Sequence, residues 1–225
     1  MATLYNLRDD VLNLAQRFAR VDDERLSEGQ VFLWIKGYRN QLLPKYTDYG
    51  KIDTEHYAQD LGVCKLETVD AANSPYKSWG MNVKKFELPP LAALPERRYI
   101  TFLGGIDKGL TNETTSIALY PSANIGAAST IALIQHMVKA TVIGHTLYIV
   151  NYEGDYVNVR AILSDPTKAK YYSSDSTWIP FNPATWEYPI GEDMGREIVD
   201  LIMTREFRIG MSTPKNVGSD GASES

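Results

Sequence analysis

The stretch SEGQVFLWIKGYRNQLLP, Ser27 to Pro44, predicts a helix with marked ends. Ser27 and Gln30 stand three residues apart, as in a capping box, in which each residue satisfies a backbone N–H group of the first turn. Leu26 and Val31 occupy the two positions of a hydrophobic staple. Because proline lacks an N–H group and its ring clashes with the preceding turn, we expect the helix to stop at Pro44.

The same stretch has one clear apolar face. Residues at helical spacing make this face: Val31, Trp34, Ile35, Tyr38 and Leu42. Phe32, Leu33 and Leu43 fall outside it, so we expect this helix to contact neighbours on more than one side.

Two further amphipathic helices are predicted, one before this stretch and one near the C-terminus. The first covers roughly residues 4–20 and should pack on the second helix as a helical hairpin. The C-terminal helix lies within residues 188–210, has Glu192 and Asp193 in its first turn, where the helix dipole favours negative charge, and has Gly210 as its stop. Its buried side is predicted to contain Met194, Ile198, Leu201, Ile202 and Phe207.

The central part of the chain is predicted to be rich in β-strands. Residues 62–70, 99–105 and 115–121 are apolar runs bounded by turn residues. Residues 140–166 hold three such runs, separated by Gly144-His145 and by residues 153–155, which predicts an antiparallel meander that ends at Asp165-Pro166. The proline-rich residues 73–98 are interpreted as a long loop, and 122–137 as a short helix.

These elements predict an α+β fold. We expect an N-terminal helical part (1–60), a central antiparallel β-rich module (61–185), and a C-terminal helix that packs with the N-terminal helices (186–210). Residues 211–225 are small and polar, which favours a flexible tail.

Composition excludes several classes of function. The net charge of −5 argues against a nucleic-acid-binding protein, which needs an excess of Lys and Arg to neutralise phosphates. The longest apolar run, 125–138, is shorter than the roughly 20 residues that cross a bilayer, so we expect a soluble protein without a membrane partner.

The sequence contains no recognisable catalytic or metal-binding motif. The histidines, His56, His136 and His145, lack metal-ligand spacing, and Cys64 has no nearby histidine to activate it. The glycine-rich residues 102–111, FLGGIDKGLT, lack the GK[ST] ending of a phosphate-binding loop and are better explained as a strand and a turn. We therefore predict no enzyme, no cofactor and no metal; an enzyme of unrecognised type would need a strongly perturbed carboxylate in a cleft.

Aromatic residues favour a role in binding. The chain has 14 tyrosines and 4 tryptophans, several of the tyrosines in polar loops, and protein interfaces are enriched in both residues. A surface that binds sugars through exposed aromatic rings is the alternative.

Several segments, in order, resemble a structural protein of crAss-like and related Bacteroidetes tailed phages. They are DDERLSEGQVFLWIKGYRNQLL (22–43), HYAQDLGVCKLETVD (56–70), YVNVRAILSDP (156–166), YPIGEDMGREIVDLIMTREF (188–207) and TPKNVGSDGASES (213–225). Each segment alone is unspecific, and the resemblance rests on their order.

The resemblance implies a ring, or head-to-tail connector, protein without a catalytic site. Such proteins form a cyclic ring, generally dodecameric, in the neck below the portal and join capsid to tail. The implied partners are further copies of the chain, the portal, and other ring or tail proteins, while DNA passes through the channel without sequence-specific binding. The implied location is the virion, with the host cytoplasm during assembly.

For this role we expect the helices to supply the packing and interface residues. These are Val31, Trp34, Ile35, Tyr38, Leu42, Ile198, Leu201 and Ile202. The alternative function is a tail-associated module that binds a glycan or receptor through Trp79 or Trp178.

Overall fold

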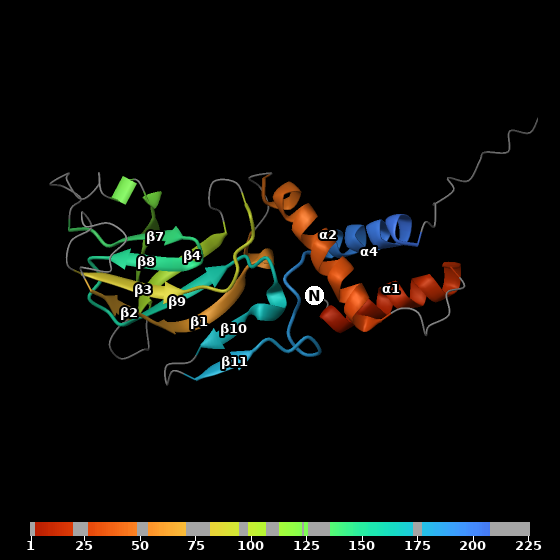
Figure 1. Cartoon of the computed structure of the whole chain (residues 1–225), viewed down its shortest axis with the longest axis horizontal. Coiled ribbons are helices and arrows are strands. Elements are labelled where there is room, and N and C mark those ends of the chain that lie inside the picture. The colour runs from red at the N-terminus through yellow and green to blue at the C-terminus, as the bar shows by residue number, and fades with distance from the viewer. Residues whose placement is uncertain are drawn as a thin grey trace, which may run out of the picture.

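The computed structural model describes residues 3–19, 27–48, 54–70, 82–94, 99–106, 113–122, 124–125, 136–172 and 177–207. Three helices gather at one end of the described chain, and two mixed sheets form the other end (Figure 1). The helices are α1 (Leu4–Ala19), α2 (Glu28–Asp48) and α4 (Glu192–Arg205). The α+β fold with N-terminal helices, central strands and a C-terminal helix is therefore confirmed.

Helix α2 begins as predicted but does not end as predicted. The N–H of Gln30 donates to Ser27 Oγ at 3.2 Å, which confirms the N-terminal cap. The expected stop at Pro44 is wrong, since α2 continues to Asp48. Pro44 lies in the last turns, where it costs one backbone hydrogen bond, and the Thr47 hydroxyl donates to the Leu43 carbonyl at 2.8 Å and supports the backbone beyond it.

The strands form one sheet of six strands and one of five. The first has the order β11 (Trp178–Pro180), β10 (Lys170–Tyr172), β1 (Gln59–Lys65), β9 (Tyr156–Ala161), β4 (Ile100–Ile106), β5 (Glu113–Ser116). The second has the order β2 (Glu67–Val69), β3 (Val83–Glu87), β8 (Thr146–Val150), β7 (Lys139–Ile143), β6 (Ala118–Leu119). Pairing is antiparallel except between β1 and β10 and between β6 and β7.

The predicted meander is wrong in its third strand. Strands β7 and β8 form the expected hairpin, with Gly144 in the left-handed region (φ +62°) at its turn. Strand β9, however, lies between β1 and β4 in the other sheet. The reason is that β3 occupies the remaining edge of β8, and the left-handed Asn151 (φ +62°) and the buried Tyr152 redirect the chain. The Tyr152 hydroxyl donates to the Tyr156 carbonyl at 2.7 Å and fixes this crossing.

Other boundaries also differ from the prediction. The supposed loop 73–98 contains β3, which is stabilised by five antiparallel residue pairs with β8. Strands β10 and β11 were not predicted, because strands of three residues are too short to show an alternation. Helix α4 ends at Arg205. Gly210, the tail 211–225 and most of the predicted helix 122–137 lie outside the described residues.

One large hydrophobic core joins the helical end to both sheets. Leu7 of α1, Ile35 of α2 and Ile198 of α4 belong to the same buried cluster as Leu103 of β4 and Ile149 of β8. A smaller cluster lies apart from it, made by Val69, Val83, Ile125 and Val150.

Candidate interaction surfaces

A buried arginine connects α2 to the rest of the chain. Arg39 is fully buried and donates to the carbonyl oxygens of Leu163 at 2.7 Å, Pro189 at 3.1 Å and Tyr57 at 3.3 Å. Its guanidinium also lies 5.8 Å from the centre of the Tyr188 ring. Burial lowers the pKa of Arg39 to about 10, which still leaves it charged at neutral pH. Arg39 therefore links α2 to three separate segments of the chain.

A second group of contacts reinforces this junction. Lys36 Nζ lies 2.7 Å from Asp165 Oδ2, and Asn40 Nδ2 donates to the Ser164 carbonyl at 2.8 Å. Asp165 also caps the short 3-10 helix Pro166–Lys168 by accepting from the Thr167 N–H. Although burial works to raise the pKa of Asp165, hydrogen bonds from Lys36 and Thr167 hold it below its ordinary value. The charged carboxylate therefore stabilises the folded chain.

Helix α2 is joined to α4 and to Glu206, directly after α4, by polar contacts. Lys45 Nζ and the Tyr46 hydroxyl bind Glu197 at 2.7 and 2.8 Å, and the hydrogen bond from Lys45 is the main cause of the lowered pKa of Glu197. The Tyr38 hydroxyl donates to Glu206 at 2.6 Å. These contacts hold the α2–α4 pair in one arrangement.

The structure places the predicted packing and interface residues in the main hydrophobic core or against it. Val31, Ile35, Tyr38, Leu42, Ile198 and Ile202 are buried, and Trp34 and Leu201 are half-buried. Their buried surface stabilises the chain itself. A neighbouring molecule can contact the half-buried Trp34 and Leu201 and exposed residues beside them, such as Leu33, whose exposed fraction is 62%.

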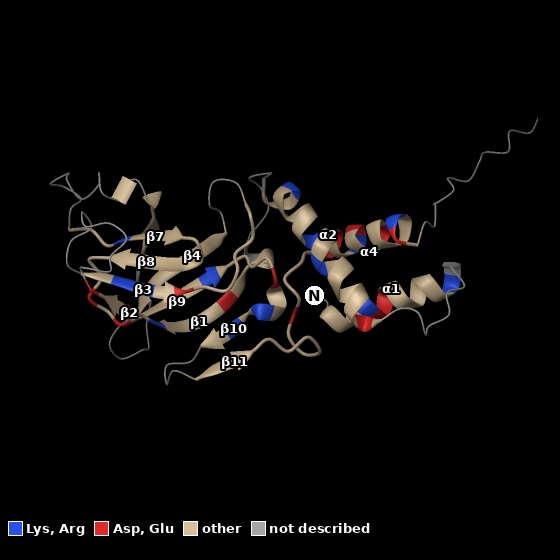
Figure 2. Cartoon of the chain, viewed as in Figure 1, with Lys and Arg blue, Asp and Glu red and all other residues tan. Residues whose placement is uncertain are grey.

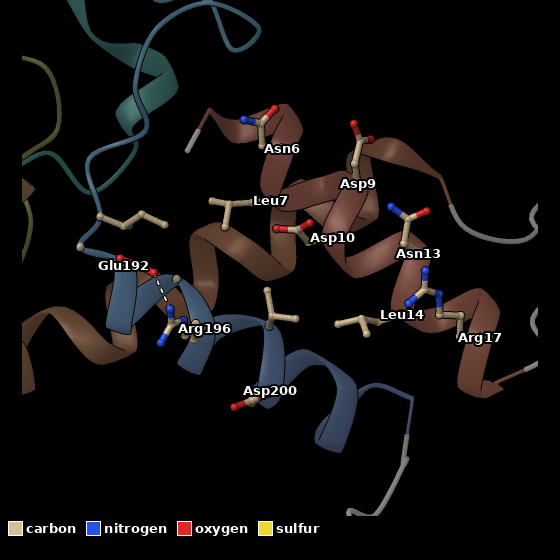
Figure 3. Close-up of a pocket in the computed structure, with 14 residues that line it drawn as sticks. Asn6, Leu7, Asp9, Asp10, Asn13, Leu14, Arg17, Glu192, Arg196 and Asp200 are labelled. Carbon is tan, nitrogen blue, oxygen red and sulfur yellow. Dashed lines mark hydrogen bonds and ion pairs between the residues drawn. The ribbon is translucent and has the colours of Figure 1, made fainter. Parts of the chain in front are cut away.

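A groove of about 1080 Å³ lies between α1 and α4. Leu7, Leu14 and Val199 contribute apolar surface, and Figure 3 shows Leu7 and Leu14 projecting from α1 on the side that faces α4. Both signs of charge occur on these helices (Figure 2). The charged groups of this α1–α4 groove are Asp9, Asp10, Arg17, Glu192, Arg196 and Asp200, so acids outnumber bases by four to two. The groove therefore combines an apolar surface with a net negative rim.

The β10–β11 hairpin presents a second uncovered surface. Strand β11 is an edge of the six-stranded sheet, and Trp178 and Ile179 on it are 51% and 53% exposed. Tyr171 on β10 is 39% exposed, and Lys170 Nζ lies 4.2 Å from the centre of the Trp178 ring. Exposed apolar side chains that cluster on an edge strand are typical of a contact surface. Tyr171 pairs with Ile179 and Tyr172 with Trp178, so Tyr171 and Ile179 lie on one face of the hairpin and Trp178 on the other. We call Tyr171, Trp178 and Ile179, which together cover both faces of this edge, the hairpin patch.

The described residues show no arrangement that favours catalysis. His56, His136 and His145 are exposed and lie on separate segments. Cys64 is fully buried, and burial raises the pKa of its thiol, which keeps it protonated and unreactive. Within the described segments, His, Cys, Asp and Glu side chains form no group of three that could hold a metal ion.

Among the helices that the structure describes, none is long and apolar enough to cross a membrane.

The chain was also compared with known proteins. The family model of crAss-like phages described as phage tail ring protein 2 matches residues 6–221. No curated protein matches the chain.

Proposed function

The chain belongs to the phage tail ring protein 2 family and is a structural protein of the phage tail or neck; from this premise, we propose that it forms a closed, dodecameric ring in the head-to-tail connector below the portal. In this position the ring joins capsid to tail. The observation that supports the proposal most is the extent of the family match, which runs over residues 6–221 of 225.

The proposed partners are other copies of the chain and adjacent virion proteins. A ring is built from heterologous contacts, in which one patch of each subunit meets a different patch of the next. We propose that the α1–α4 groove, which is lined by both helices, and the exposed hairpin patch serve as two such patches. The portal and other ring or tail proteins contact the remaining faces, and the ring assembles in the host cytoplasm before it becomes part of the virion.

DNA is proposed to pass through the ring without being bound in a sequence-specific way. The net charge of −5 favours this, because an acidic channel wall repels phosphates and does not retain DNA during passage. The proposed role is mechanical and requires no catalytic step.

The test is to measure the oligomeric state and symmetry of the full chain. Mass photometry of the purified protein, alone and mixed with the portal, should reveal one large discrete oligomer. Negative-stain class averages should then show a ring with cyclic symmetry. A protein that stays monomeric alone and with the portal would refute the proposal.

The exposed hairpin patch also supports a second candidate, a tail-associated module that binds a glycan or receptor. Trp178 and Tyr171 expose aromatic rings of the type that stack on sugars; Trp79 lies outside the described residues. This alternative predicts saturable glycan binding by calorimetry that Trp178→Ala abolishes while the oligomeric state stays unchanged. The ring proposal predicts no such binding.

A further inference from the structure

We propose that the hairpin patch of one subunit docks into the α1–α4 groove of the next subunit and thereby makes the repeating contact of the ring. This inference rests on the proposed ring function and adds the two surfaces that meet. The groove is therefore occupied by the hairpin of a second copy of this chain.

The groove has the properties of a receptor for an apolar and weakly basic element. The half-buried Leu14 offers apolar surface within it, while Asp10 and Asp200 are exposed and form no ion pair with any residue that the structure describes. Asp9 and Glu192, by contrast, are already paired, with Arg8 and Arg196 respectively. The carboxylates of Asp10 and Asp200 are therefore available for a partner, and with the exposed Arg17 they leave the groove with a net negative charge.

The hairpin has the complementary properties. Its exposed Trp178 lies beside Lys170 on one face, Ile179 lies beside Tyr171 on the opposite face, and Lys168 is exposed just before β10. Over residues 166–181 the sequence has these two lysines and one acid, Asp175. An apolar element with a net positive charge would thus meet an apolar groove with a net negative charge. Such complementarity selects the partner and the register of docking.

Symmetry favours this pairing over contact between like surfaces. Two hairpins that paired with each other, or two grooves, would make an isologous contact that closes as a dimer. A hairpin in a groove is heterologous and continues around a ring. Within one molecule the two surfaces cannot meet, because β11 lies at the lower edge of the sheets, away from the α1–α4 pair (Figure 1).

Reversing charges tests the contact. Lys170→Glu should raise the subunit concentration needed for half-assembly, alone or on the portal, by about tenfold, because it sets like charges against each other. Asp10→Lys combined with Lys170→Glu should restore assembly to within about threefold of wild type. The matched control is Lys65→Glu, an exposed lysine on β1 outside both surfaces, which should leave assembly unchanged.

Removing the aromatic anchor is a second test. Trp178→Ala should weaken assembly by about thirty-fold or more, as expected for a tryptophan at the centre of an interface. The circular dichroism spectrum and melting temperature of the free subunit should stay near wild type, since this side chain is half exposed in the single chain.

Disulfide trapping locates the contact directly. Subunits with both Asn13→Cys and Ile179→Cys should form a ladder of covalent oligomers on mild oxidation, whereas the buried Cys64 does not react. The control pair, Asn13→Cys with Glu67→Cys, places the second cysteine on the exposed side of β2 and should form no ladder.

The outcomes separate this inference from the ring proposal. Rings that persist in Trp178→Ala and Lys170→Glu would overturn the inference and leave the ring function intact. Failure of the charge-swapped pair to recover, together with the absence of a ladder, would overturn it as well. Covalent dimers of Ile179→Cys alone would instead indicate pairing between hairpins. A wild-type chain that never assembles would overturn both proposals.

Discussion

At the scale of single residues, Arg39 shows how a buried charge can organise a fold. A guanidinium has donors in a planar fork, and here they meet carbonyl oxygens from three separate segments. The sequence could not reveal this role, because an arginine beside an apolar helical face is normally solvated. Only the long-range placement of Leu163 and Pro189 makes burial of Arg39 favourable.

We predict that Arg39→Met lowers the free energy of unfolding by about 2–5 kcal/mol, because it leaves buried carbonyl groups without donors. Urea denaturation monitored by circular dichroism measures the change. The control is Arg196→Met, where an exposed arginine loses only its pair with Glu192 on the same helix and stability should change by less than about 0.5 kcal/mol. An equal effect of both substitutions would contradict the role assigned to Arg39.

Asp165 provides a prediction about pH. Its pKa is lower in the folded than in the unfolded chain, so the folded state binds fewer protons near that pKa. Its contribution to stability is therefore present above the unfolded pKa, about 4, and is lost as the pH falls through the lower folded value.

Asp165→Asn should accordingly be less stable than wild type at pH 7. The difference between the two free energies of unfolding should stay constant down to about pH 5 and shrink below about pH 4. Urea titrations at a series of pH values measure it. Glu67→Gln, which removes an exposed carboxylate near Lys85, is the control and should show a much smaller difference. A difference for Asp165→Asn that does not vary with pH would rule out the ion pair as its cause.

At the scale of secondary-structure elements, the prediction succeeded where the signal was local. The helical repeat of α2, the cap at Ser27 and the Gly144 turn depend on residues close together in the sequence. Strand β3 and the placement of β9 depend on partners far away, and the sequence around them has no local feature that identifies those partners. The missed strands are therefore the ones whose formation is decided by tertiary pairing.

Pro44 gives a prediction for α2. Because α2 passes through this proline, Pro44→Ala restores the backbone N–H that can bond to the Asn40 carbonyl and removes the clash with it. We expect the free energy of unfolding to rise by about 1–3 kcal/mol, with a higher melting temperature. The reference is Gly37→Ala, at an exposed position of the same helix where a new side chain would meet no nearby atoms. It should raise the free energy of unfolding by about 1 kcal/mol. A lower melting temperature for Pro44→Ala would show that the proline is needed.

Trp34 gives a prediction for the contact between α2 and the end of α4. Its ring meets Phe207 edge-on, with centroids 5.7 Å apart. Because Trp34 is only half-buried, Trp34→Ala should cost about 1–3 kcal/mol, less than the 3–5 kcal/mol typical of a core tryptophan. A double-mutant cycle with Phe207→Ala should give a coupling energy of about 0.5–1.5 kcal/mol. A coupling energy near zero would show that the two rings stabilise the chain independently.

At the scale of the whole molecule, the sequence predicted that the protein works through contact surfaces but not which residues form them. Aromatic content indicated a protein that works through contacts, but the α1–α4 groove brings Asp10 and Asp200 together from opposite ends of the chain. Such a surface exists only after folding. The hairpin patch depends likewise on β10 pairing in parallel with β1, which no local pattern around Tyr172 indicates.

The expected division of the chain into residues 1–60, 61–185 and 186–210 leads to a prediction about cooperative unfolding. Because one core cluster includes α1, α2, α4 and strands of both sheets, we propose that these parts unfold as one cooperative unit. Scanning calorimetry of the full chain should give a single transition with equal calorimetric and van't Hoff enthalpies. A fragment of residues 61–185, which lacks Arg39 and the helical part of the core, should show no cooperative melting. A fragment with a sharp transition and dispersed amide signals would show that the β-rich module is an independent domain.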